Sequence, residues 1–253
     1  MVRPILIIAM LLVSANQASA RTWHINSSGT GDAPTIAAAI DSSVAGDRIE
    51  LECGTYAESR LQMKSGVTIC SSTGVPDCVT IDGSSPPLPP GPVISCYSMD
   101  DDTLIEGLTI TGGRATDWLY GQHGGGLSIA YGAGPRVERC VIIGNYARVG
   151  GGVHVFQSQP TFVDCEISGN EALTSYGGVH VTGGGVFTAV RTSIFGNIGY
   201  DGVVNSDSAA NFYCCDLALG NWLFQGSHII DDTDCDPVST ETRSLGSVKA
   251  LFR

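Results

Sequence analysis

Two arginines and two carboxylates recur along the chain at a spacing that could place them side by side. Arg139, Asp164 and Arg191 follow one another at steps of 25 and 27 residues, and Glu166 lies two residues after Asp164. If the chain returns to the same place once per step, Asp164 and Glu166 could hold Ca²⁺, whose preferred ligands are oxygens. Arg139 and Arg191 would lie beside them, so the four residues form a candidate catalytic set.

Two carboxylates are too few for a Ca²⁺ site, which takes six to eight oxygen ligands. The alternative, which we favour, is a ladder of opposite charges on the surface, worth roughly 0.2–1 kcal/mol per cross-strand pair.

Two histidines share the same kind of spacing. His154 and His180 each stand at the centre of a Val-His-Val segment, one repeat apart. At the strand spacing of about 5 Å, two imidazoles could share a metal ion or a proton. With Asp164 and Glu166 they are the candidate metal ligands. We favour the simpler interpretation, a solvated row of outward side chains.

Aromatic residues gather in the segments between one repeat and the next. A sugar suits rings that carry a polar group, because such rings offer an apolar face and a wet edge. If the coils stack, the tyrosines would form a row along the axis, about 10–15 Å long over three coils. The alternative is that these rings shield glycine-rich turns. The candidate binding residues are Trp118, Tyr120, Tyr146, Tyr176 and Tyr200.

These residues take their positions from an internal repeat. Three consecutive segments align: GGGLSIAYGAGPRVERCVIIGN, GGGVHVFQSQPTFVDCEISGN and GGVHVTGGGVFTAVRTSIFGN. The Gly-Asn pairs end at Asn145, Asn170, Asn197 and Asn221, at steps of 25, 27 and 24 residues. Periods of about 20–50 residues indicate solenoids or propellers, and propeller blades need about 40. The shorter period favours a solenoid of coils.

Within each copy, apolar residues alternate with the β period of two. The first strand recurs at Leu127, Val153, Val179 and Val203, so these side chains should form one buried column. Stacked coils put like residues at the strand spacing of about 4.8 Å. A second inward column should contain Cys140, Cys165 and Thr192, which makes the two cysteines core residues rather than nucleophiles. The repeated asparagines should form a hydrogen-bonded ladder at a turn, where Asn tolerates the left-handed conformation.

The N-terminal part of the chain has a different pattern. Ile36, Ala39, Ile40 and Val44 predict a short amphipathic helix over about 34–46 that covers the open end of the solenoid. A strand over 47–53 should follow, with Ile49 and Leu51 inward. The proline-rich stretch 84–92 should be a loop. After Trp222 the repeat fades, so 223–253 is expected to be a terminal cap or tail and 21–222 the β-helix with its N-terminal cap.

The first twenty residues predict export. Arg3 precedes an apolar run over 5–13, and small residues at 18–20 resemble a cleavage site. Residues 1–20 therefore read as a signal peptide, and the alternative is an uncleaved N-terminal anchor. We expect a secreted, extracellular or cell-surface protein, with the periplasm as another destination.

The net charge limits which ligands the protein can bind, and the cysteines limit which metal sites and disulfides it can form. A formal net charge of −12 disfavours nucleic acid, whose phosphates bind Lys and Arg, and would repel polyanionic sugars unless cations intervene. Nine cysteines leave at least one unpaired, and none has zinc-site spacing. Cys70–Cys78 is the simplest disulfide and Cys53–Cys78 its rival. We expect a monomer without a membrane span and without a cofactor, except Ca²⁺ if the chain is a lyase.

Several motifs resemble one known superfamily. They are TIAAAID…GDRIEL…GTY (35–56), GVTI (66–69), VTIDG (79–83) and the GGGV…GN coils. Residues 30–222 resemble the pectin-lyase-like superfamily and, more closely, bacterial secreted right-handed parallel β-helix repeat proteins. The resemblance implies an all-β, single-stranded right-handed parallel β-helix of about seven coils with a short N-terminal capping helix.

The enzymes of that superfamily are matched only in fragments. Gly54, Tyr56 and Glu58 fit the GxYxE element of pectin methylesterases, but the other signatures of those enzymes are absent. The ordered motifs of polygalacturonases are absent too. We therefore expect a non-catalytic secreted or cell-surface β-helix that contacts glycans or other surface partners. The alternative is a polysaccharide lyase or hydrolase of the pectin-lyase-like type that acts on acidic polysaccharide. For a lyase, the resemblance implies that Asp164 and Glu166 would hold Ca²⁺ against a sugar carboxylate and that an arginine would take a proton.

Overall fold

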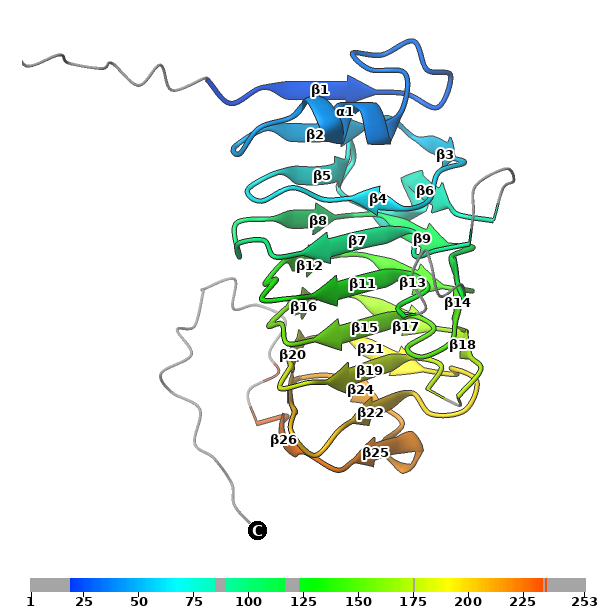
Figure 1. Cartoon of the computed structure of the whole chain (residues 1–253), viewed down its shortest axis with the longest axis vertical. Helices are drawn as coiled ribbons and strands as arrows, with labels where there is room; N and C mark the ends of the chain where they lie inside the picture. Colours follow the sequence, from blue (N-terminus) through cyan, green and yellow to red (C-terminus); the bar gives the residue numbers. More distant parts are fainter. Residues whose placement is uncertain (1–18, 85–89, 117–122, 175, 234, 236–253) are drawn as a thin grey trace, which may run out of the picture.

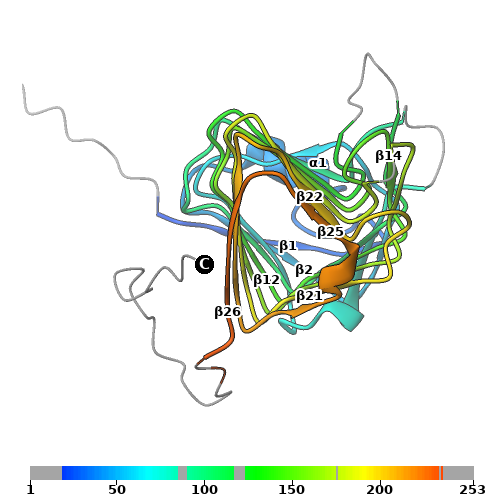
Figure 2. The same ribbon diagram turned by 90° about the horizontal axis from the view of Figure 1, so that it is seen from below.

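The coils of the chain place short strands on three sides of a triangular cross-section (Figure 2). Successive coils stack along one long axis, so that like strands pair in parallel (Figure 1). The computed structural model describes residues 19–84, 90–116, 123–174, 176–233 and 235. The architecture is the all-β parallel β-helix that the repeat predicts. Within the described residues, no helix has the length and apolar character needed to cross a membrane.

Three long parallel sheets and one small sheet make up the β-helix. Sheet A contains β1 (Thr22–Ile25), β2 (Arg48–Leu51), β5 (Thr68–Ser71), β8 (Leu104–Glu106), β12 (Arg136–Glu138), β16 (Thr161–Val163), β20 (Val186–Val190), β23 (Ala209–Tyr213) and β26 (Ser227–Asp231). Sheet B contains β3 (Gly54–Tyr56), β6 (Val79–Asp82), β9 (Thr109–Thr111), β13 (Val141–Ile143), β17 (Glu166–Ser168), β21 (Ser193–Phe195) and β24 (Asp216–Leu217).

Sheet C lies on the third side of the coil. It contains β4 (Leu61–Gln62), β7 (Ile94–Tyr97), β11 (Leu127–Ala130), β15 (Val153–Phe156), β19 (Val179–Thr182), β22 (Gly202–Val204) and β25 (Trp222–Phe224). The small sheet D, at the corner between sheets B and C, contains β10 (Arg114–Ala115), β14 (Tyr146–Ala147) and β18 (Glu171–Ala172). Sheets B and C have seven strands each, whereas β1 and β26 extend sheet A to nine. Two short 3₁₀ helices, η1 (Pro76–Cys78) and η2 (Leu219–Asn221), complete the elements.

A short helix, α1 (Ile36–Ser42), packs against the N-terminal end of the solenoid. The Thr35 hydroxyl accepts a hydrogen bond from the Ala38 amide at 3.0 Å and so caps the first turn. Ile36 and Ile40 are buried in the core, as predicted. Val44 is not, with 51% of its surface exposed, because the extended backbone at Ser43 ends the helix before Val44 can join the apolar stripe.

The inward columns follow the predicted alternation, with one correction. Leu127, Val153 and Val179 pair in register and are fully buried. In the next coil Gly202, not Val203, pairs with Val179. A one-residue shift moves a side chain to the opposite face of a strand, so Val203 does not continue this column. The space beside Gly202 is filled by the ring of Trp222, which would lie 2.1 Å from a Cβ at that position.

The repeated asparagines form the predicted ladder. Asn145 donates to the Asn170 side chain at 3.1 Å, and Asn170 donates to Asn197 at 3.0 Å. Asn197 and Asn221 both donate to the buried carboxylate of Asp201. The left-handed residues are the glycines immediately before three of the asparagines, not the asparagines themselves: Gly144, Gly169 and Gly196, at φ 67°, 60° and 65°.

Two disulfides link turns of neighbouring coils. Cys53 pairs with Cys78, and Cys214 pairs with Cys235. The simplest pairing, Cys70–Cys78, is therefore wrong, because the strand register places Cys53 and Cys78 at the same turn position of adjacent coils, with Cα atoms 4.6 Å apart. The remaining cysteines, Cys70, Cys96, Cys140, Cys165 and Cys215, are free.

Candidate functional site

The turn from sheet A to sheet B repeats one unusual backbone conformation in successive coils. Its first residue has positive φ at Gly107, Arg139, Asp164, Arg191 and Cys214, between 46° and 65°. Residues other than glycine rarely adopt this left-handed conformation, which here is imposed by the sharp corner of each coil. The side chains of Arg139, Asp164 and Arg191 consequently project from the same corner, one coil apart.

An open groove of about 400 Å³ lies beside this corner. The structure brings together all four candidate catalytic residues in its lining: Arg139, Asp164, Glu166 and Arg191. The thiols of Cys140 and Cys165 lie beneath them and are at most 4% exposed. Burial raises the pKa of both thiols, to about 12 for Cys165, so they are protonated core groups, as the sequence predicts.

Two of the charged groups in the groove, Arg191 and Asp164, form an ion pair. Arg191 donates to both carboxylate oxygens of Asp164, from Nε at 2.6 Å and from a terminal nitrogen at 2.7 Å. This two-pronged contact is the strongest geometry for an arginine and a carboxylate. The hydrogen bonds that Arg191 donates to Asp164 raise the pKa of Arg191 above its ordinary value. Arg191 therefore stays a cation that is held against the Asp164 side chain.

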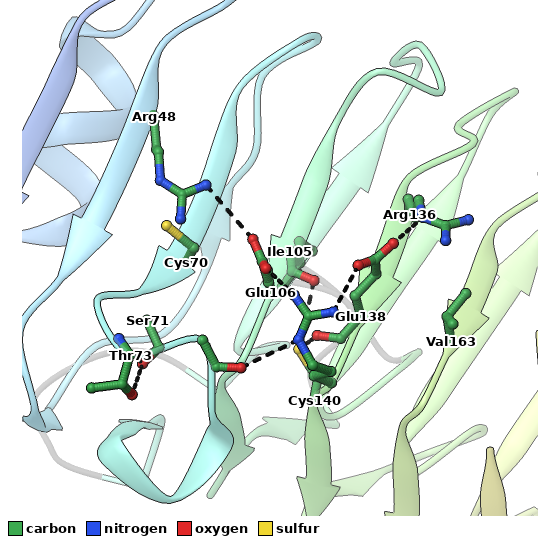
Figure 3. Close-up of polar contacts among 12 residues, drawn as sticks. Arg48, Cys70, Ser71, Thr73, Ile105, Glu106, Arg136, Glu138, Cys140 and Val163 are labelled. Atoms are coloured by element: carbon green, nitrogen blue, oxygen red, sulfur yellow. Dashed lines mark hydrogen bonds and ion pairs between the residues drawn. The ribbon is translucent and has the colours of Figure 1, made fainter. Parts of the chain in front are cut away.

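Arg139 belongs to a separate chain of alternating charges on sheet A. Its guanidinium contacts the carboxylates of Glu106 and Glu138. Glu138 also contacts Arg136 (Figure 3). Glu106 in turn lies 3.6 Å from the Arg48 guanidinium. Because the strand register stacks the two glutamates on neighbouring strands, one arginine between them offsets their repulsion.

The fourth groove residue does not complete a metal site. Glu166 accepts a hydrogen bond from the Ser168 hydroxyl at 2.6 Å, whereas both oxygens of Asp164 contact Arg191. Over the part of the chain that the structure describes, no three His, Cys, Asp or Glu residues are grouped so that they could hold a metal ion. The donor set does not fit Ca²⁺, which requires more oxygen ligands.

The two candidate histidines are buried, not solvated as the sequence suggested. His154 and His180 lie on the outer face of sheet C, yet only 4% and 7% of their surfaces are exposed. Residues of the neighbouring corner cover them: His123 stacks on His154 at 4.6 Å between ring centroids, and Tyr176 stacks on His180 at 5.0 Å. Burial lowers the pKa of His154 well below its usual range and that of His180 to about 4. Both are neutral imidazoles at pH 7.

The candidate aromatic row does not form. Tyr146 pairs in sheet D with Glu171 of the next coil, and the Arg114 guanidinium lies 5.7 Å from the Tyr146 ring centroid. Tyr176 instead packs inward on His180, and Tyr200 is 37% exposed. These tyrosines share a corner but not a column, because turns of different length place them at different points. Trp118 and Tyr120 lie outside the described residues.

A different aromatic cluster was missed from the sequence. Tyr97, Tyr131 and Phe156 lie where sheet C turns toward sheet A, and Tyr131 contacts the other two edge-on. The ring centroid of Tyr131 lies 6.0 Å from that of Tyr97 and 5.7 Å from that of Phe156. Aligning ISCYS (94–98) with LSIAY (127–131) would have revealed the cluster, but the proline-rich loop before residue 94 hides that earlier repeat.

A second depression, of about 210 Å³, adjoins this cluster at Tyr97. Its other lining residues are Arg60, Gln62, Pro92 and Ser95. The lining contains hydrogen-bonding side chains and no carboxylate, in contrast to the net charge of −12 of the whole chain.

The residues that match the esterase element have structural roles. The Tyr56 hydroxyl donates to two backbone carbonyls, and burial raises the pKa of Tyr56 to about 12. The Glu58 carboxylate accepts hydrogen bonds from the amides of Ile36 and Ala37, at 2.8 and 3.0 Å. Glu58 therefore caps the exposed amides at the start of α1.

Comparison with known proteins agrees with this architecture. The family described as the right-handed β-helix region matches residues 90–217. No curated protein matches the chain. Among solved structures, the crystal structure of pectate lyase Pel9A has 13% identity and a TM-score of 0.45 and covers 86% of this chain and 79% of its own.

Two pectin methylesterase structures are similar to the same extent. One is a complex with a hexasaccharide, and the other is PemA from Erwinia chrysanthemi. Each has 16% identity and a TM-score of 0.46, over 87% of this chain and 68% of its own. At such low identity these similarities concern the fold alone.

Proposed function

This chain belongs to the right-handed β-helix family, and from that premise we propose that it is an exported, non-catalytic β-helix that contacts glycans. Its solenoid presents side chains at fixed intervals on a rigid surface, which suits an extended partner. The partners expected are polysaccharides or cell-surface glycans.

One observation carries the non-catalytic assignment. The only cluster that the sequence offers for acid–base chemistry contains Arg191 bound through two hydrogen bonds to Asp164. A catalytic base must be free to take a proton, and a Ca²⁺ ligand must be free to coordinate. Neither group is free in this pair, and Arg139 is likewise held by two glutamates.

The disulfides support export. Cys53–Cys78 and Cys214–Cys235 are bonds that persist in oxidising surroundings and are rare in the cytosol. They agree with the signal-like features of residues 1–20. The proposed location is therefore outside the cytoplasm, either secreted or at the cell surface.

An enzymatic alternative is favoured by one feature of the groove. Arg139, Asp164, Glu166 and Arg191 line a single open depression of about 400 Å³, which is large enough to admit a sugar unit. A substrate carboxylate that replaced Asp164 as the partner of Arg191 would break this ion pair and leave the Asp164 side chain available. The alternative function is a lyase or hydrolase that acts on acidic polysaccharide.

The test is a screen of the purified protein, without residues 1–20, against acidic and neutral polysaccharides with and without Ca²⁺. We expect binding to a polysaccharide, with neither unsaturated products that absorb in the ultraviolet nor new reducing ends. Product formation that disappears in Arg191→Gly but persists in the control Arg136→Ala, which lies outside the groove, would establish the enzymatic alternative.

A further inference from the structure

The cluster of Tyr97, Tyr131 and Phe156, here called the aromatic platform, has the geometry of a binding surface. Tyr97, Ala130 and Phe156 occupy the same outward position on three successive strands of sheet C. Because Ala130 is small, the ring of Tyr131 fits between the two larger side chains. The platform therefore extends over two coil steps, about 10 Å along the axis.

Tyr131 combines a strained backbone conformation with an exposed ring. Its φ is 62°, a conformation that bulky residues rarely adopt, and 61% of its surface is exposed. The core therefore gains little from this ring. The neighbouring Phe156 ring depends on Gly183 in the next coil, where a Cβ would lie 2.4 Å from it. Ser98 and Gln157 adopt the same conformation at this turn position in the neighbouring coils, so the turn requires the conformation but not an exposed aromatic ring.

The depression beside the platform supplies polar groups. Tyr97 belongs to both surfaces, and its hydroxyl donates to Ser128 at 3.1 Å, which fixes the ring. Gln62 and Arg60 are exposed at the rim. An apolar ring face next to hydrogen-bonding side chains is the combination that recognises sugars, whose rings have one apolar face and a hydroxylated edge.

We propose that the aromatic platform and the adjoining depression bind two neighbouring pyranose units of a glycan. One sugar stacks on Tyr131, and the hydroxyls of the next contact the polar depression. The lining supplies hydrogen-bonding side chains from Gln62, Ser95 and Tyr97 and has no carboxylate, so it suits the hydroxyl groups of a pyranose. The inference rests on the proposed glycan-binding function and names its site.

The experiment uses Tyr131→Gly, because glycine adopts the required φ without strain. Isothermal titration with a panel of neutral and anionic pyranose oligosaccharides first identifies one that the wild-type protein binds. We expect Tyr131→Gly to weaken that binding about tenfold or more, through loss of ring contact. Tyr131→Phe should keep affinity within about threefold, because stacking needs only the ring.

Gln157→Gly is the matched control, since Gln157 occupies the equivalent turn position of the next coil at φ 49° and is exposed. The Gln157→Gly variant should bind the oligosaccharide with the same affinity as the wild-type protein. Equal affinity of Tyr131→Gly and wild type would overturn the site while leaving the glycan-binding function intact. If the wild type binds no oligosaccharide or polysaccharide, the function and the site both fail.

Discussion

Asp164 and Arg191 occupy the same turn position in successive coils, both in the left-handed conformation, and are joined by two hydrogen bonds. The same column of turn residues begins with the Cys53–Cys78 disulfide and ends with Cys214, which is bonded to Cys235. One corner of the solenoid is thus cross-linked along its length by covalent bonds and an ion pair.

The left-handed backbone conformation of Arg191 should affect the stability of variants at this position. Arg191→Gly loses the exposed ion pair, worth about 0–1 kcal/mol, but relieves the left-handed strain. Arg191→Ala loses the pair and keeps the strain. We expect the free energy of unfolding of Arg191→Ala to be about 1 kcal/mol below that of Arg191→Gly, measured by urea denaturation. Equal stability of the two variants would contradict a strained turn.

The asparagine ladder should be a large source of stability. Asn170 is fully buried and hydrogen-bonded to Asn145 on one side and Asn197 on the other. Asn170→Ala leaves several buried polar groups without partners, which should lower the free energy of unfolding by about 3 kcal/mol. Gln159→Ala, a substitution of an exposed residue, is the control in the same denaturation experiment. It should change the free energy of unfolding by less than about 0.5 kcal/mol.

The buried histidines predict a loss of stability in acid. Burial lowers the pKa of His180 to about 4, from about 6.5 in the unfolded chain, so the unfolded state binds more protons between these values. The free energy of unfolding should therefore be constant above about pH 6.5 and fall as the pH drops toward 4. His180 alone should account for about 3 kcal/mol of that fall.

Urea denaturation at several pH values checks this dependence. His180→Gln should flatten the slope between pH 6.5 and 4. His24→Gln changes a histidine whose side chain is 59% exposed and is the matched control. A slope that is the same in wild type and His180→Gln would show that another group governs the acid response.

The disulfide pairing is a direct chemical prediction. Peptide mapping under non-reducing conditions should find Cys53 linked to Cys78 and Cys70 free. The bond closes a loop across 25 positions, so Cys53→Ser combined with Cys78→Ser should lower the free energy of unfolding by about 3 kcal/mol. Cys70→Ser, the same substitution at a cysteine that forms no disulfide, is the comparison. A Cys70–Cys78 peptide would refute the register of the first coils.

The repeat by itself determined which residues become vertical neighbours. A period of about 25 residues with alternation of two placed Asn145, Asn170 and Asn197 in a ladder and Cys140 and Cys165 in the core, because every coil presents the same positions to the next. The fold class and the gathering of Arg139, Asp164 and Arg191 follow from the same periodicity.

Only the tertiary structure decided what covers each column and which charges pair. His154 and His180 have an outward position in sequence but are buried, because His123 and Tyr176 from the neighbouring turns stack on them. Arg139 turns to sheet A, whereas Arg191 turns to Asp164. Regular strands fix the spacing along the axis, but turns of unequal length fix what lies over each face, so the tyrosines of one corner separated while Tyr97, Tyr131 and Phe156 came together.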